Sequence, residues 1–74
     1  MKELDVTKIE GRLKHKTIFQ LFDDLEKAES FIIKNDHDPK PLFYTFQAER
    51  EGTFEWEYLK EGPEWWHVKL TKKI

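Results

Sequence analysis

The stretch Asn-Asp-His-Asp-Pro-Lys-Pro, residues 35–41, marks the joint around which the rest of the chain is organised. It follows an apolar run at residues 31–33, and it precedes an amphipathic segment that begins at Leu42. Asp38 followed by Pro39 is typical of a helix start, with the aspartate as N-cap and the proline at the first helical position. The pattern therefore predicts that a strand ends here, that a helix begins, and that polar side chains lie at the joint.

Before this joint the sequence predicts a strand, a helix and a second strand. Residues 3–7 alternate, with two apolar side chains on one face, and residues 7–12 read as a polar loop. Residues 13–28 carry apolar side chains at helical spacing, so this stripe should face the core: Ile18, Leu21, Phe22, Leu25 and Ala28. The short β-branched run at 31–33 predicts a strand buried on both sides.

After the joint, residues 39–49 predict a second helix, which Gly52 closes with a left-handed conformation. The last third predicts a hairpin that turns at Gly62-Pro63. Its apolar faces meet if Trp56 lies opposite Leu70, and the same register places Glu57 opposite Lys69 as an ion pair. The residues expected to face the helices are Phe54, Trp56, Tyr58, Trp66, Val68 and Leu70.

The element order β-α-β-α-β-β predicts an α+β fold for one domain, residues 1–74. A strand–helix–strand unit crosses over with a right hand, so the first two strands should be parallel neighbours or near-neighbours. Two helices can cover one face of a four-stranded mixed sheet. We therefore expect a two-layer sandwich whose second sheet face is open to water or to a partner.

Composition excludes several functional classes. The 74 residues contain no cysteine, which removes disulfides, thiolate ligands and cysteine nucleophiles. A net charge of −2 argues against a nucleic-acid surface, which is normally basic. No apolar run approaches the roughly 20 residues of a membrane span, and the first residues do not resemble a secretory signal. We expect a cytoplasmic domain that is monomeric rather than dimeric.

Several motifs resemble those of an uncharacterised bacterial domain-of-unknown-function family of small TusA/SirA-like proteins, often found beside hemerythrin-like or cupin domains. The resemblance rests on the run at residues 35–41, on Trp-Glu-Tyr-Leu at 56–59, and on Glu-Gly-Pro-Glu at 61–64. It implies the TusA/SirA-like form of this fold, and hemerythrin-like or cupin-type proteins as partners. TusA-like sulfur carriers place a Cys-Pro pair where Gly11 and Arg12 stand here, so a cysteine-based sulfur-carrier role is excluded.

The two predicted helix starts offer the main candidate site. His15, Asp36, His37 and Asp38 could converge on a metal, with zinc or iron suited to imidazole and carboxylate ligands. The alternative ligand is an anion, because helix starts carry free amides and positive dipole ends, to which Lys14, His15 and Lys40 add donors. The simplest alternative assigns Asp38 to the helix cap, Asp36 to the turn, and His37 to the loop.

The outer face of the hairpin offers a second candidate surface. Trp65, Leu59 and His67 fall on it and could contact a partner protein. No nucleophile stands beside a base and no glycine-rich phosphate loop occurs, which favours a non-enzymatic role. The sequence thus predicts an accessory or binding module, with a metal-binding or small redox-associated domain as the alternative.

Overall fold

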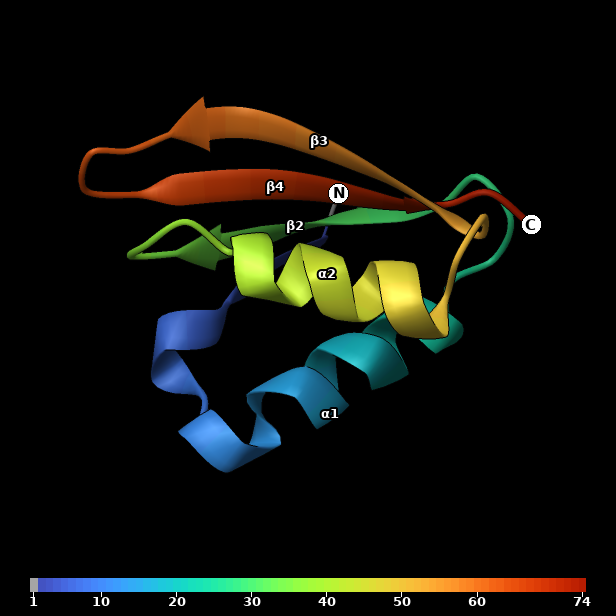
Figure 1. Cartoon of the computed structure of the whole chain (residues 1–74), viewed down its shortest axis with the longest axis horizontal. Coiled ribbons are helices and arrows are strands. Elements are labelled where there is room, and N and C mark those ends of the chain that lie inside the picture. Colours follow the sequence, from blue (N-terminus) through green and yellow to red (C-terminus); the bar gives the residue numbers. More distant parts are fainter. Residues whose placement is uncertain (1) are drawn as a thin grey trace.

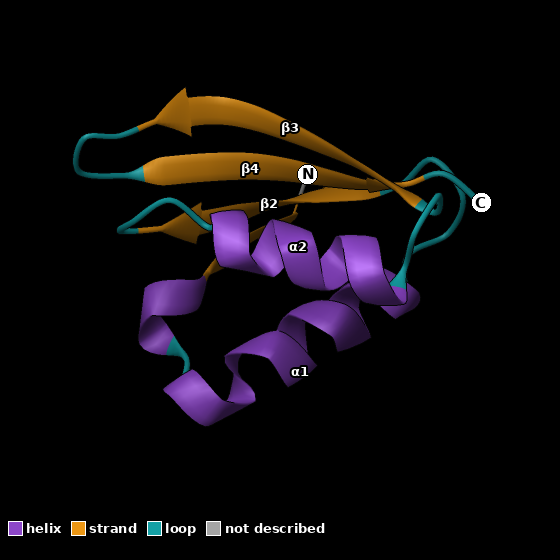
Figure 2. Cartoon of the chain, in the orientation of Figure 1, coloured by secondary structure: helices purple, strands orange, loops and turns teal. Residues whose placement is uncertain are grey.

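A computed structural model describes residues 2–74 and shows a four-stranded sheet with both α-helices on one side (Figures 1 and 2). The strand order is β1-β2-β4-β3, with β1 parallel to β2 and the other neighbours antiparallel. The elements are β1 (Lys2–Asp5), a 3-10 helix η1 (Val6–Lys8), α1 (Gly11–Asp23), β2 (Ser30–Asn35), α2 (Lys40–Glu49), β3 (Phe54–Glu61) and β4 (Trp66–Lys72). The predicted α+β class, element order and two-layer arrangement are confirmed. Within the described residues, no helix has the length and apolar character needed to cross a membrane.

The hairpin register is the one expected from the alternation of apolar residues. Trp56 pairs with Leu70, and Glu57 pairs with Lys69. The register then shifts, because Tyr58 pairs with Val68 but Lys60, not Leu59, pairs with His67. Leu59 is therefore the extra residue of a β-bulge, a feature that the alternation did not reveal.

The core lies between the sheet and the two helices, and aromatic side chains fill much of it. Phe46 of α2 is fully buried and stacks on Phe19 of α1 at a centroid distance of 4.2 Å. Its ring also meets Phe22, Phe54 and Trp56 at 5.2, 5.4 and 6.4 Å. The buried apolar side chains are Val6, Ile18, Phe22, Phe31, Ile33, Leu42, Phe46, Phe54, Val68 and Leu70.

The first helix is shorter at its end than helical spacing predicted. It begins at Gly11, two residues early, and ends at Asp23 rather than at residue 28. Ala28 has a φ of 73°, which an α-helix does not allow. Lys72 Nζ donates to the carbonyl oxygen of Asp23 (3.0 Å), and Arg50 forms two hydrogen bonds with the Asp23 carboxylate (2.9 and 3.0 Å). Contacts distant in sequence thus satisfy the helix end and hold the pKa of Asp23 below its ordinary value, the bond to Arg50 being the largest cause.

Three smaller expectations about the strands and the second helix were wrong. The first strand ends at Asp5, since Asp5 accepts hydrogen bonds from the Thr7 amide and hydroxyl and so starts the 3-10 turn. The β2 strand is buried on one face only, because Ile32 points to the open sheet face and is half-buried. The α2 helix ends at Glu49 with Arg50 as its C-cap, so Gly52, at φ 76°, belongs to the following turn.

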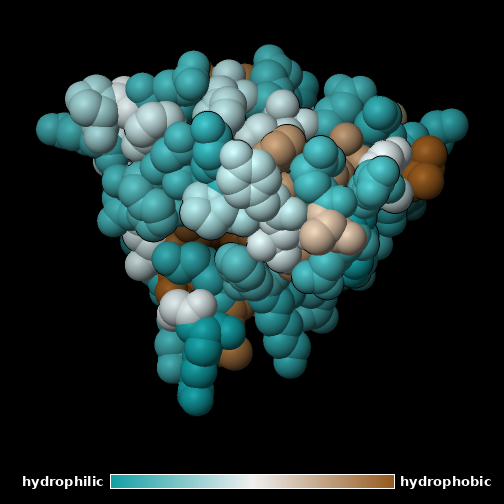
Figure 3. All heavy atoms as spheres, viewed as in Figure 1, coloured by the Kyte–Doolittle hydropathy of each residue, from teal (hydrophilic) through white to brown (hydrophobic). Residues whose placement is uncertain are grey.

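The outer surfaces carry mostly polar side chains. Figure 3 shows a largely hydrophilic surface in the view of Figure 1, with small, separate hydrophobic areas instead of one continuous patch. Of the large apolar side chains in residues 2–74, those exposed are Leu13, Tyr44, Leu59 and Ile74. Leu13 lies on α1, Tyr44 on α2, Leu59 on β3, and Ile74 follows β4.

Candidate functional site

Three connections meet at one end of the sheet (Figure 1). They are the turn between β3 and β4, the β2–α2 connection, and η1 with the start of α1. The parallel pairing of β1 and β2 is the reason, because the carboxyl ends of parallel strands lie at the same edge and each leads into a helix. The sequence expectation that both helix starts share one edge is therefore confirmed.

A cavity of about 80 Å³ lies at this edge, and we call it the helix-start cavity. Its polar lining comes from Lys14 and His15 on α1, from Asn35 at the end of β2, and from His37 in the connection. Its apolar lining comes from Val6, Ile18, Pro39, Pro41 and Leu42. Lys14, His15 and His37 were predicted as site residues, and all three line this one cavity.

Asn35 is a member of the cavity that sequence reasoning missed. Among the described residues, Asn35 is the polar residue that is buried, at 5% exposure. Its carboxamide oxygen accepts a hydrogen bond from the backbone amide of Asp36 (2.9 Å). This bond leaves the amide NH₂ as the remaining polar end of the side chain, and an NH₂ group only donates. A polar residue at a strand end indicates a candidate site only when it is known to be buried. The alternation of the sequence alone predicts only that Asn35 faces inward.

Asp36 orients His37 and does not itself line the cavity. The Asp36 carboxylate lies 2.8 Å from His37 Nδ1, with both side chains 64% exposed. If Nδ1 carries a proton it donates to Asp36, and Nε2 is then the free nitrogen of a neutral ring. The contact therefore orients the His37 ring, which is what Asp36 can do chemically at this site.

Asp38 does not cap the second helix, so that expectation was wrong. The residue at the N-cap position of α2 is Pro39, with no side-chain cap, and the amide of Leu42 donates to the carbonyl oxygen of Pro39 (3.0 Å). The Asp38 carboxylate instead accepts a hydrogen bond from the hydroxyl of Tyr58 on β3 (2.7 Å). A partly buried tyrosine hydroxyl requires an acceptor, and Asp38 supplies it from across the sheet.

The Asp38–Tyr58 contact also changes the titration of the tyrosine. Burial raises the pKa of Tyr58 above its ordinary 10.0, and the Asp38 carboxylate raises it further. The indole N–H of Trp56 opposes this rise, although its geometry falls short of a hydrogen bond and Nε1 is buried without another partner in residues 2–74. Tyr58 therefore stays protonated and ties the connection that carries His37 to the sheet.

We expect Tyr58→Phe to loosen this connection and to lower the free energy of unfolding. Losing one hydrogen bond to a charged group costs roughly 1.5–3 kcal/mol. Because the folded pKa of Tyr58 is raised, the stability that this group contributes is fully present below the ordinary pKa of 10.0 and is lost as pH rises through the folded value. The variant should therefore lose less stability in alkali than the wild type. Urea titrations at pH 8 and 11, with amide shifts of residues 35–40, provide the measurement.

Tyr44→Phe is the matched control, since this tyrosine lies on the outer side of α2 and is 61% exposed. It should leave both the alkaline profile and the amide shifts unchanged. Equal behaviour of the two variants would contradict the role given to Tyr58.

The α1 side of the cavity is electropositive. Glu10 occupies the N-cap position of α1 but makes no side-chain cap, and its carboxylate pairs with Arg12 at 2.8 Å. The amides of the first turn are therefore not capped by a side chain, and the helix dipole adds to the charge of Lys14. Lys40, predicted as a further donor, starts α2 but does not line the cavity.

The predicted metal ligands are brought together only in part. His15 and His37 line the same cavity, whereas Asp36 binds His37 and Asp38 binds Tyr58. Across residues 2–74, no group of three or more His, Cys, Asp or Glu side chains is arranged to hold a metal ion.

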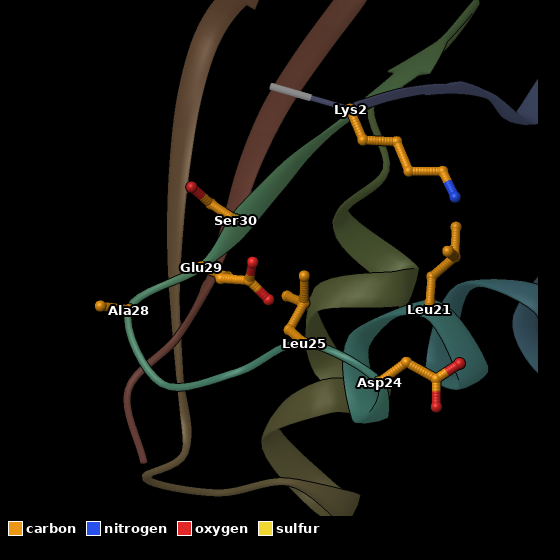
Figure 4. Close-up of a pocket in the computed structure, with 7 residues that line it drawn as sticks. All are labelled: Lys2, Leu21, Asp24, Leu25, Ala28, Glu29 and Ser30. Atoms are coloured by element: carbon orange, nitrogen blue, oxygen red, sulfur yellow. The ribbon is translucent and has the colours of Figure 1, made fainter.

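A larger cavity, with a volume of about 590 Å³, lies elsewhere, between the start of β1 and the loop after α1 (Figure 4). Figure 4 shows Leu21 and Leu25 on its helical side, with the Lys2 amine directed toward Leu21. The Glu29 carboxylate accepts the amide hydrogen of Glu26 (2.7 Å) and so serves the loop itself. The charged lining of this cavity is of both signs, Lys2 on one hand and Asp24 and Glu29 on the other, and we do not assign it a ligand.

The second predicted surface is also partly assembled. Trp65 and His67 line a cavity of about 300 Å³ on the open sheet face, together with Asp5, Lys34 and Lys60. Leu59 does not line it, because the bulge turns this residue out at 47% exposure.

Comparisons with known proteins agree with this architecture. The solution structure of HP1264 from Helicobacter pylori is similar over 100% of both chains, with a TM-score of 0.75 and 14% sequence identity, which shows a shared fold. No curated protein matches the chain. A model of the uncharacterized conserved protein family DUF2249 matches residues 3–72. Since this match spans nearly the whole chain, the protein belongs to the DUF2249 family.

Proposed function

We propose that this domain is a non-enzymatic binding module that takes an anionic group, a carboxylate or an oxyanion, into the helix-start cavity. The observation that carries the proposal is the grouping of Lys14, His15 and His37 around one small cavity. The positive end of α1 adds to this charge. Asp36 and Asp38 do not line the cavity; Asp38 binds Tyr58, whereas Asp36 pairs with His37 and reduces the attraction of that ring for an anion.

The shape of the cavity supports the binding of one end of a larger ligand. Its volume of about 80 Å³ is small beside the roughly 300–1,000 Å³ typical of small-molecule sites. Val6, Ile18 and Leu42 provide an apolar wall next to the basic groups. An acidic side chain of a partner protein, or a small acid, satisfies both features. Hemerythrin-like and cupin-type proteins are the first partners to try. The chain has no cysteine, so its resemblance to TusA/SirA-like proteins does not extend to sulfur carriage through a thiol.

A metal-binding role is the second candidate, and one observation favours it. Histidine ligands of metals usually donate their other ring nitrogen to a carboxylate, and His37 has this arrangement with Asp36. His15 and His37 would be the protein ligands, and zinc or iron the metal. Two imidazoles are fewer than the three protein ligands of catalytic zinc sites, so water or a partner would complete the coordination.

One titration separates the two candidates, because they respond to acid with opposite signs. Sulfate keeps its double negative charge between pH 5.5 and 7.5, whereas histidine side chains in general gain a proton, and with it a positive charge, as the pH falls over this range. We expect sulfate to bind more tightly at pH 5.5 and His37→Ala to weaken it by about tenfold, as for the loss of one charge-assisted hydrogen bond. The imidazole resonances of His15 and His37 provide the measurement, and zinc is titrated in parallel.

His67→Ala is the matched control, because this histidine lies on the opposite face of the sheet. It should leave the sulfate response of His15 and His37 unchanged. Zinc binding that moves both rings at pH 7.5 and is lost at pH 5.5 would favour the metal, since only neutral imidazole is a ligand. Sulfate that moves neither ring would refute the anion proposal.

A further inference from the structure

A row of charged side chains crosses the open face of the sheet at the end nearest the β3–β4 turn. The strand register places Asp5 beside Lys34, Lys34 beside His67, and His67 beside Lys60. Trp65 precedes β4 at this end, and all five side chains line the cavity of about 300 Å³. This cavity and the helix-start cavity share no lining residue.

The bulge at Leu59 gives this row its charge. In an uninterrupted register Leu59 would lie opposite His67, because Tyr58 lies opposite Val68. The extra residue moves Leu59 out of the row and places Lys60 opposite His67 instead. Bulges commonly redirect a side chain in this way beside functional sites. Here the effect is to exchange an apolar side chain for a cationic one.

The charges of the row are unevenly satisfied. Lys34 Nζ lies 2.6 Å from the Glu3 carboxylate, which holds the pKa of Glu3 below its ordinary value. The Asp5 carboxylate accepts the amide and hydroxyl hydrogens of Thr7 at 3.0 and 2.5 Å. Lys60 and His67, by contrast, form no hydrogen bond or ion pair through their side chains within residues 2–74. Because Lys60 and His67 lie directly opposite each other, one carboxylate between them can contact both side chains.

We propose that this surface, the Lys60–His67–Trp65 cavity, docks an acidic segment of a partner protein. A glutamate or aspartate carboxylate of the segment lies between Lys60 and His67. The half-buried indole of Trp65 provides an apolar wall for the hydrocarbon part of the same segment. Charge complementarity identifies the occupant, because Lys60 has no carboxylate partner among the described residues, whereas Thr7 engages Asp5, and Lys34 engages Glu3, which also interacts electrostatically with His67.

An acetylated, amidated hexaglutamate peptide tests the proposal with the intact chain. We expect saturable shifts of the Trp65 indole N–H and of the His67 ring. Lys60→Met removes the charge and keeps the unbranched stem, and it should weaken binding by about tenfold, as for loss of a hydrogen bond to a charged group. Lys69→Met is the matched control on the same face, where Lys69 already lies opposite Glu57. It should change the affinity by less than about twofold.

Four results would overturn the proposal. The first is an equal effect of the two substitutions while both variants keep the wild-type dispersion of amide shifts. The second is an equal response to a hexalysine peptide. The third is a concentration-dependent shift of Trp65 without peptide, which would assign this face to a second copy of the chain. A peptide that moves only His15 and His37 would also refute this surface while leaving the helix-start cavity supported, so the two proposals fail separately.

Discussion

Replacing Phe46 by alanine should remove most of the domain's free energy of unfolding. Phe46 has no exposed surface, and its ring contacts four aromatic rings, two from α1 and two from β3. Truncating a buried phenylalanine costs about 3–5 kcal/mol, from lost burial and from the cavity left behind. A folded chain typically has about 0.05–0.15 kcal/mol per residue of stability, so 74 residues leave little reserve. Urea unfolding followed by tryptophan fluorescence provides the measurement.

Tyr44→Ala is the control for Phe46→Ala, because it truncates an aromatic residue of the same helix at 61% exposure. Its only described ring contact is with Phe43, at 5.7 Å. We expect the free energy of unfolding to change by about 0.5 kcal/mol or less, as for other surface positions. A loss below about 1 kcal/mol for Phe46→Ala would mean that the helices do not pack on the sheet as described.

Gly62→Ala is the second substitution with a large expected effect. Gly62 has a φ of 64°, and an added Cβ would lie 2.9 Å from Trp66 Cζ2. The left-handed conformation costs an alanine roughly 1–2 kcal/mol, and forcing the half-buried indole to move costs roughly 1–3 kcal/mol more. We therefore expect a loss of about 2–5 kcal/mol in the free energy of unfolding, measured by urea titration.

Gly52→Ala separates the two causes. Gly52 also has a positive φ, 76°, but nothing lies within 4 Å of an added Cβ. It should therefore lose only the conformational part, roughly 1–2 kcal/mol. Trp66 should keep its ring contact with Tyr58 in this variant but not in Gly62→Ala, which the indole N–H shift of Trp66 reports. Equal losses for the two glycines would show that the Trp66 contact does not contribute.

Local patterns in the sequence predicted much of the fold. The alternation in residues 54–58 and 66–70 gave the face and the register of the hairpin as far as Tyr58, because side chains of a strand alternate strictly between its two faces. The strand–helix–strand order predicted that β1 and β2 are parallel, since the handedness of this connection leaves few alternatives. Both helices were recognised from their apolar spacing. The bounds of the second helix were predicted to within one residue, whereas those of the first were not.

Element ends were less predictable because they depend on partners distant in the sequence. The α1 helix ends at Asp23, where Lys72 and Arg50 satisfy its last carbonyl and its carboxylate. Asp38 was predicted to be a cap because aspartate before proline is a common cap. It instead accepts a hydrogen bond from Tyr58, which lies twenty residues away in the sequence and is outside the reach of a local pattern. Helix propensity cannot predict a hydrogen bond that depends on the position of β3 in the sheet.

The candidate site divides in the same way. Local sequence was enough to place His15 and His37 near two helix starts, and to exclude thiol chemistry. Both rings line one cavity, Asn35 is buried beside them, and both aspartates have other partners. This arrangement depends on the packing of α1 and α2 against the parallel pair β1–β2. The position of Lys60 beside His67 depends on a bulge whose presence no alternation pattern signals. Residue types and spacing follow from the chain, whereas burial and neighbourhood arise only when distant segments exclude water together.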